Sequence, residues 1–143
     1  MVRKATNDDI KILADFAYQL FGDSLEAQEN EMREFLQNDN VQLFICCDGD
    51  NPVGFAQCQL RRDYVEGTSS SLVGYLEGIF VQKEFRRKGF AKELLSACED
   101  WAKSIGCTEF ASDCEIDNET SIAFHKSMHF EEANRIVCFA KKL

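Results

Sequence analysis

The sequence predicts an α/β (α+β) fold in which helices cover both faces of a mixed central sheet. The predicted elements follow the order β-α-α-β-β-β-α-β-α-β. Two strand-like segments flank the turn DGDN at 48–51, which is typical of an antiparallel hairpin. A strand, a helix and a second strand then run from Leu72 to Ile116, which implies a parallel pair joined by a right-handed crossover.

The first half of the chain begins with a short strand, VRKAT at 2–6, and continues with two helices. Thr6 and Asp9 have the spacing of a capping box at the start of the first helix, and Gly22 ends it. Its apolar residues recur at helical spacing, at Ile10, Leu13, Ala14, Ala17, Leu20 and Phe21. The second helix spans 23–39, with an inner face of Leu25, Met32, Phe35 and Leu36. The hairpin strands are 41–47 and 52–60.

The second half of the chain alternates strands and helices. A polar loop at 61–71 leads into an apolar strand at 72–81. The next helix ends before Gly106 and has an apolar face of Ala91, Leu94, Leu95, Cys98, Trp101, Ala102 and Ile105. A strand at 107–116, a short helix at 118–130 capped by Asn118, and a closing strand at 133–143 complete the chain.

Length and composition favour one domain, 1–143, with a single core. The seven cysteines include no CxxC pair and no apolar signal peptide opens the chain, which together favour a reduced, cytoplasmic protein. The apolar runs are too short to span a bilayer, so no membrane partner is expected. A formal net charge of −9 argues against a nucleic-acid partner and leaves room for a cationic substrate, although acidity for solubility alone is commoner.

A basic glycine turn, KEFRRKGFAKELL at 83–95, contrasts with this acidic chain. Arg86, Gly89 and Ala91 form the pattern R-x-x-G-x-A at a predicted helix start, where free backbone N–H groups and the helix dipole attract anions. The small residues allow close approach, so the turn has the features of a pyrophosphate site. The alternative is a solvated helix start with chance cations. The Walker lysine and serine are absent, which argues against an ATPase loop.

Two carboxylates occupy positions that suggest a site. Glu77 lies inside the apolar strand GYLEGIFV, where a charge is costly unless it is paired or faces a ligand. If that strand is regular, the residues sharing its face are Tyr75, Ile79 and Val81. Gly78 indicates either a bulge or a close approach of a ligand. Asp113 lies near the end of the next predicted strand, where ligands gather in open sheets. The alternatives are a solvent-facing Glu77 and an Asp113 that serves a turn.

The glycine turn also carries a family resemblance. RRKGFA resembles the acetyl-CoA pyrophosphate loop, [RQ]-x-x-G-x-[GA], of the GCN5-related N-acetyltransferases, and NETSIAFHKSMHF resembles their motif N-x-x-[AS]-x-x-x-Y-x-x-x-G-F. The element order of the family matches essentially the whole chain. The resemblance implies a mostly antiparallel sheet and acetyl-CoA as co-substrate. The residues it assigns to acetyl-CoA are Ile79, Phe80, Val81, Arg86, Arg87, Lys88, Gly89, Phe90, Ala91, Asn118 and Ser121.

A narrower resemblance covers three segments. LRRDYVEGTSSSLVGYLEGIFV, GCTEFASD and FEEANRIVCFAKK are similar to segments of aminoglycoside 6′-N-acetyltransferases. This implies acetylation of a polycationic small molecule at a primary amine, the 6′-amine of an aminoglycoside, with Glu77, Asp113 and His125 as catalytic residues. The substrate-binding residues it implies are Phe21, Asp63, Tyr64, Glu66, Tyr75, Glu77, Asp113 and Glu115.

The chemistry explains why carboxylates suit such a substrate. An aminoglycoside amine is mostly protonated at neutral pH, so a carboxylate can hold the ammonium and accept its proton before the amine attacks the thioester. We expect direct transfer in a ternary complex, with N–H groups near Ile79–Val81 polarising the thioester carbonyl. His125 replaces the family tyrosine that protonates the leaving thiolate, as in the narrower group; a half-buried helix histidine is the alternative. His129 replaces a glycine and is expected to strain the helix end.

Several alternatives stay open. The same acidic site would serve another polyamine or a protein amine, and a non-catalytic acetyl-CoA sensor would keep the fold without the transfer. HKSMH has histidines at i and i+4 but no evident third ligand, so no metal site is expected. The closing strand could pair with a second copy, which is compatible with a homodimer.

Overall fold

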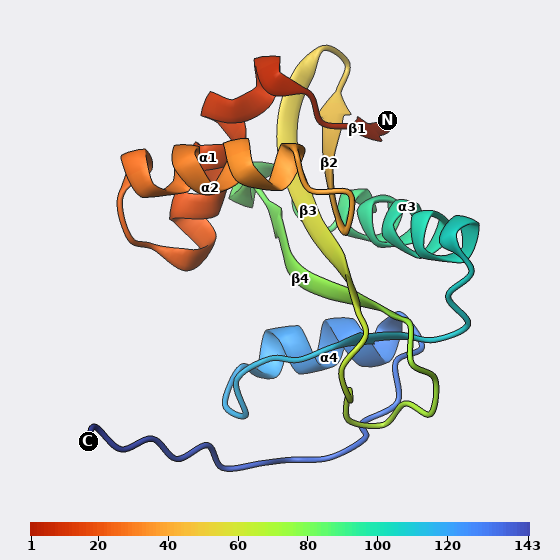
Figure 1. The fold of residues 1–143 in the computed structure, drawn as a ribbon. Coiled ribbons are helices and arrows are strands. Elements are labelled where there is room, and N and C mark those ends of the chain that lie inside the picture. The colour runs from red at the N-terminus through yellow and green to blue at the C-terminus, as the bar shows by residue number, and fades with distance from the viewer.

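The computed structural model describes residues 1–143, and a five-stranded sheet lies at its centre (Figure 1). Its strands follow one another in chain order, and only the β4–β5 pair is parallel. The strands are β1 (Val2–Lys4), β2 (Val41–Asp48), β3 (Asn51–Arg61), β4 (Val73–Val81) and β5 (Phe110–Ser112). The predicted mixed, mostly antiparallel sheet is confirmed, together with its hairpin and its parallel crossover.

Four helices cover the sheet: α1 (Ile10–Phe21), α2 (Leu25–Leu36), α3 (Phe90–Ile105) and α4 (Glu119–Ser127). Figure 1 shows α1 and α2 on one side of β3 and α3 on the other. Phe16 of α1 and Met32 of α2 belong to one buried cluster with Phe55. Leu95 of α3 belongs to a second cluster with Leu76. None of these helices has the length and apolarity that a membrane crossing requires.

Most of the cysteines lie in the core. Five of the seven are buried, and all seven are free thiols. Burial raises the pKa of the Cys46 thiol to about 11, so this group stays protonated at neutral pH. The buried thiols therefore act as small apolar side chains.

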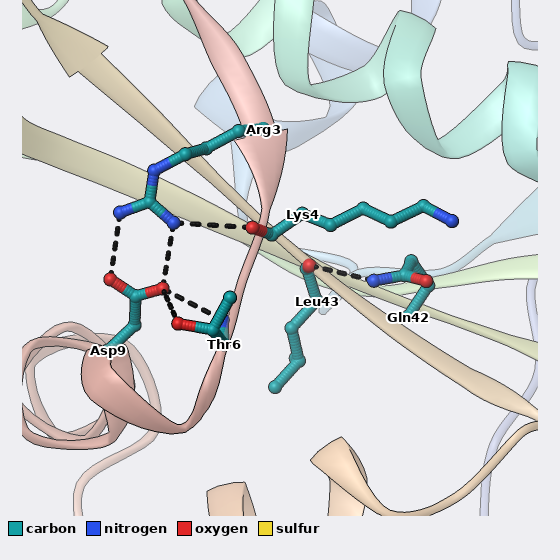
Figure 2. A network of polar contacts seen from close by, with 6 residues as sticks. All are labelled: Arg3, Lys4, Thr6, Asp9, Gln42 and Leu43. Carbon is teal, nitrogen blue, oxygen red and sulfur yellow. Dashed lines mark hydrogen bonds and ion pairs between the residues drawn. The ribbon is translucent and has the colours of Figure 1, made fainter.

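A single 3-10 turn, Asn7–Asp9, leads into α1, and its start is held by the predicted capping box and by an ion pair (Figure 2). Asp9 Oδ2 accepts a hydrogen bond from the backbone N–H of Thr6 at 2.8 Å, and Arg3 donates to both Asp9 oxygens at 2.8 Å. The hydrogen-bonded guanidinium is the main cause that holds the pKa of Asp9 below its ordinary value. This buried carboxylate ties β1 to α1.

Asp9→Asn is expected to lower the free energy of unfolding by about 1–2 kcal/mol at pH 7, because it breaks a charge-assisted pair at a buried position. Since the folded-state pKa of Asp9 is lowered, its contribution is present above the unfolded-state pKa of about 4 and is lost as the pH falls through the folded-state value. Urea unfolding at pH 7 and pH 3 measures this, with exposed Asp8→Asn as the control. A difference in the free energy of unfolding between wild type and Asp9→Asn that is larger at pH 3 than at pH 7 would contradict the prediction.

β4 contains a β-bulge at Glu77. The register of β4 against β3 slips by one residue between Leu76 and Gly78, so Glu77 has no partner residue on β3. The extra residue shifts the alternation of side chains, which places Tyr75 on the face of Gly78. The bulge indicated by Gly78 is confirmed. The common face predicted for a regular strand is wrong. Tyr75 precedes the bulge and faces one side of the sheet, whereas Ile79 and Val81 follow the bulge and face the other side.

The predicted closing strand at 133–143 is absent. The chain from Glu131 to Leu143 forms no helix or strand and extends away from the sheet (Figure 1). Ile136, Val137 and Phe139 are 69%, 77% and 92% exposed. A strand needs a neighbour for its backbone hydrogen bonds, and this segment finds none within its own chain. The apolar pattern indicated strand propensity, but it could not supply the partner.

Two smaller predictions also differ from the structure. β5 has three residues where ten were expected, so Asp113 follows the strand directly. Leu25, predicted on the inner face of α2, is 49% exposed. Gln28 takes a buried position on this helix instead, and its Nε2 donates to the carbonyl of Gly22 at 3.0 Å.

The end of α4 confirms the expected strain at His129. The N–H of Phe130 donates to the carbonyl of His125, and the N–H of His129 donates to Lys126, which is the Schellman pattern. His129 adopts a φ of +69°, the left-handed conformation that favours glycine. An ordinary residue in this position costs about 1 kcal/mol.

His129→Gly is therefore expected to raise the free energy of unfolding by about 1 kcal/mol, which corresponds to a Tm increase of about 3 °C for a chain of this size. Thermal unfolding monitored by circular dichroism measures the shift. Ser127→Gly, inside the same helix, is the matched control and should lower the Tm, since glycine is unfavourable there. An unchanged or lower Tm for His129→Gly would contradict the prediction.

Candidate active site

The basic glycine turn lies between the end of β4 and the start of α3. Gly89 precedes the helix with a φ of +91°, which other residues rarely adopt, and Arg87 has a φ of +62°. The N–H groups of the first helical turn, 90–92, have no intrahelical acceptor. Because Arg87, Lys88 and Gly89 are exposed, an anion has open access to these donors.

The cations of this turn are not neutralised by the protein. Arg86 Nε donates to the carbonyl of Val81 at 2.9 Å, which anchors the turn to β4. None of Lys83, Arg86, Arg87 and Lys88 belongs to an ion pair with a carboxylate. Free backbone donors and uncompensated positive charge therefore coincide, as an anion site requires.

β4 presents a free edge beside the turn. β5 pairs with β4 only at residues 74–76, so no strand adjoins the edge from Glu77 to Val81. On the opposite edge, the N–H of Gln82 donates to Val53 at 2.8 Å. The alternation of an antiparallel ladder then directs the N–H groups of Ile79 and Val81 to the free edge. Two such donors suit an oxygen that develops negative charge.

Glu77 lies in the bulge at the start of this free edge, with its side chain 21% exposed. Its Oε1 accepts hydrogen bonds from Nη2 of Arg61 at 2.7 Å and from Nε of Arg61 at 3.2 Å. Arg61 is the last residue of β3. The carboxylate is therefore paired within the protein and also accessible to a ligand.

Asp113 is joined to the same cluster through Tyr75. The Tyr75 hydroxyl donates a short hydrogen bond to Asp113 Oδ2, and Arg61 stacks over the Tyr75 ring at 3.5 Å from its centre. Burial, followed by the bond to Asp113, raises the pKa of Tyr75, so its hydroxyl stays protonated and donates. Side chains from β3, β4 and the end of β5 thus bring the two predicted carboxylates into one network.

An aromatic wall and a loop border this cluster. A Cβ on Gly78 would lie 2.5 Å from Cζ of Phe21, so the ring packs directly against the bulge. The loop after β3 is anchored by Glu109, which accepts from the N–H of Ser70 at 2.8 Å and from that of Ser69 at 3.0 Å. The hydrogen bond from the Ser70 hydroxyl is the main cause that lowers the pKa of Glu109. The loop therefore has a fixed base.

His125 is half-buried on α4, and both of its ring nitrogens have partners. Nδ1 lies 2.7 Å from the backbone oxygen of Ser121, which only accepts, so Nδ1 carries a hydrogen. Nε2 lies 2.8 Å from Oγ of Ser112. Ser112 pairs with Leu76, the residue before Glu77. The imidazole is thus held beside the point where β4 and β5 separate.

A match to a known protein family spans both the basic turn and the acidic cluster of this site. The model of the acetyltransferase (GNAT) family matches residues 10–130, which include the glycine turn, Glu77, Asp113 and His125. The chain belongs to this acetyltransferase family. The family resemblance predicted from RRKGFA is therefore confirmed.

Relatives of this acetyltransferase carry a narrower name. This chain is 40% identical over 125 residues to aminoglycoside N(6′)-acetyltransferase type 1 of Acinetobacter baumannii, and the match covers 87% of this chain and 86% of the relative. It is 34% identical over 142 residues to the protein of that name from Acinetobacter haemolyticus, covering 99% and 98%. These matches confirm the predicted likeness to the aminoglycoside enzymes.

Solved structures agree with the sequence matches. The apo aminoglycoside 6′-N-acetyltransferase AAC(6′)-Ig from Acinetobacter haemolyticus has a TM-score of 0.95 at 34% identity and covers 100% of this chain and 99% of its own. AAC(6′)-Iy, in complex with the bisubstrate analogue CoA-S-monomethyl-acetylneamine, also has a TM-score of 0.95, at 35% identity, with coverage of 100% and 98%.

Other predicted site residues of the acetyltransferase take different positions. Asp63, Tyr64 and Glu115 are exposed, and their side chains form no hydrogen bond or ion pair. Glu66 accepts from Asn134 at 2.9 Å, so it contacts the C-terminal segment. Asn118 caps α4 by accepting from the N–H of Ser121 at 3.1 Å. These residues stay predicted ligand contacts.

Sequence reasoning missed two residues that hold the site. Arg61 was assigned to a polar loop, although a carboxylate inside an apolar strand calls for a cation on a neighbouring strand. Ser112 directly precedes Asp113, and only the β4–β5 register reveals that its hydroxyl meets His125.

Proposed function

We propose that this acetyltransferase transfers the acetyl group of acetyl-CoA to the 6′-amine of an aminoglycoside. The observation that carries the proposal is the placement of Glu77 and Asp113 in one network at the free edge of β4, next to an unneutralised basic turn. A polyanionic and a polycationic substrate would meet there. The identity of 34% over 142 residues to an aminoglycoside N(6′)-acetyltransferase supports the choice of substrate.

The residues of the glycine turn fit the pyrophosphate of acetyl-CoA. The first-turn N–H groups of α3 supply donors, and Arg86, Arg87 and Lys88 supply charge that no carboxylate offsets. Ile79 and Val81 offer N–H groups to the thioester carbonyl on the free edge of β4. Each requirement of the co-substrate thus has a matching group in the chain.

In the proposed reaction, Glu77 accepts a proton from the substrate ammonium, and Asp113 holds the cationic sugar. The neutral nitrogen attacks the thioester carbonyl, so that an N–C bond forms and the C–S bond breaks. The attacking nitrogen releases its second proton to water as the amide forms, and the thiolate leaves and takes a proton from His125, whose Nε2 is held near this point by Ser112. No covalent enzyme intermediate is required.

The experiment compares neamine with paromamine, which carry an amine and a hydroxyl at position 6′ and are otherwise identical. Thiol release from acetyl-CoA is expected with neamine only. Equal rates with both would contradict acetylation at 6′. Activity only with spermidine or a lysine peptide would favour the polyamine or protein-amine alternative. Tight acetyl-CoA binding without turnover of any amine would favour a sensor.

We also propose that residues 1–143 act as one cytoplasmic domain that forms a homodimer. The support is the exposed segment 131–143, in which the side chains of Ile136, Val137 and Phe139 are largely open to solvent. Pairing with a second copy would cover Val137 and Phe139. Light scattering should give twice the monomer mass for the full chain and the monomer mass for residues 1–131. A monomeric full chain at micromolar concentration would contradict the dimer.

A further inference from the structure

Arg61 binds Glu77 in an asymmetric way. Both of its bonding nitrogens, Nη2 at 2.7 Å and Nε at 3.2 Å, reach the same oxygen, Oε1. No hydrogen bond or ion pair involves the other oxygen, Oε2. The guanidinium therefore restrains the carboxylate through one oxygen and leaves the second one free.

The position of Arg61 is itself restrained on its other side. Its guanidinium stacks 3.5 Å from the centre of the Tyr75 ring, and the Tyr75 hydroxyl bonds to Asp113. The register places Arg61 opposite Val73, two residues before Tyr75, so both side chains share one face of the sheet. Stacking and a two-nitrogen contact suit arginine and do not suit lysine.

A restraint matters at this place because Glu77 is the extra residue of a β-bulge. It lacks the cross-strand neighbour that orients other side chains of β4. A proton acceptor that is free to rotate would often point away from the amine, and loss of alignment on the 1 Å scale lowers a rate on the order of 100-fold. Arg61 has no acceptor, so it cannot take the proton itself.

We propose that Arg61 is a positioning residue that fixes Glu77 so that Oε2 receives the proton of the substrate amine. Tyr75 holds the arginine in place and links this carboxylate to Asp113. The inference rests on the proposed function of Glu77. It assigns Arg61 no contact with the reacting atoms, so its whole effect passes through Glu77.

The test is a double-mutant cycle of Arg61→Gln and Glu77→Gln, measured with neamine and acetyl-CoA. In the wild-type background, Arg61→Gln should lower kcat on the order of 10-fold to 100-fold, with the KM for acetyl-CoA unchanged and the KM for neamine not raised. In the Glu77→Gln background it should change kcat less than about 2-fold, because the residue through which it acts is gone. Arg61→Lys keeps the positive charge but not the two-nitrogen contact, so it should recover only part of the lost kcat.

Arg62→Gln is the matched control, since it removes the same charge from the next residue, which bonds instead to Asn40 at 2.9 Å. It should leave kcat unchanged, and circular dichroism should show that all variants fold. If a misfolded Arg61→Gln prevents the cycle, Arg61→Lys replaces it in both backgrounds.

The outcomes separate two failures. Wild-type kcat in Arg61→Gln, or an equal loss in both backgrounds, would overturn this inference while leaving Glu77 in the mechanism. Wild-type kcat in Glu77→Gln would overturn the proposed role of Glu77 and this inference with it.

Discussion

Glu77→Gln is expected to lower kcat by at least about 100-fold while the KM for acetyl-CoA changes less than about 2-fold. The amide keeps the shape of the side chain and its contact with Arg61, but it cannot accept a proton from the substrate ammonium. Acetyl-CoA is expected to bind at the backbone of Ile79–Val81 and at the glycine turn, which this substitution does not touch. Its affinity should therefore remain.

Steady-state kinetics with neamine, combined with calorimetric titration of CoA, measures both quantities. Glu99→Gln, the same chemical change on α3, is the control and should retain wild-type kcat. If Glu77→Gln turned over at the wild-type rate, Glu77 would have no role in proton transfer, and Asp113 or a water would have to accept the proton.

Gly54→Ala is expected to destabilise the fold by about 3 kcal/mol. Gly54 lies in β3 beside β4, and an added Cβ would overlap the backbone oxygen of Phe80 and lie 3.0 Å from Sγ of Cys46. The backbone of β4 cannot yield without disturbing its ladder with β3, in which Phe80 pairs with Phe55. Overpacking of a closed interior therefore has to be relieved by strand displacement.

Urea unfolding of wild type and Gly54→Ala measures the loss. The matched control is Gly49→Ala in the hairpin turn, where a Cβ meets no atom within 4 Å but the φ of +60° is unfavourable for alanine. Its cost should be about 1 kcal/mol. If both substitutions lowered the free energy of unfolding equally, close packing at Gly54 would not explain its effect.

Much of the fold was predictable because its signals are local. The capping box of Thr6 and Asp9, the stops at Gly22 and Gly106, and the turn at 48–51 each depend on a few adjacent residues, and each is confirmed. The closing strand failed for the opposite reason. Its apolar residues are present, but a strand at 133–143 depends on a neighbour that its own chain does not provide.

The candidate site divides in the same way. Its anion-binding half lies within consecutive residues, so RRKGFA was sufficient to predict it. The acidic half is assembled from three strands. Glu77 and Asp113 were singled out from their local settings, but the link between them runs through Tyr75 and Arg61, and Arg61 was missed.

The sequence by itself determined the element order up to the last helix, the acetyltransferase family and the basic glycine turn, because these are properties of short segments and their spacing. Only the tertiary structure decided the register between strands. That register leaves Glu77 without a partner in a bulge, turns Tyr75 to the other face from Ile79, and ends the β4–β5 pairing at Leu76. A slip of one residue in a ladder reverses every later side chain, and although Gly78 indicates a bulge, no local pattern fixes which residue loses its partner.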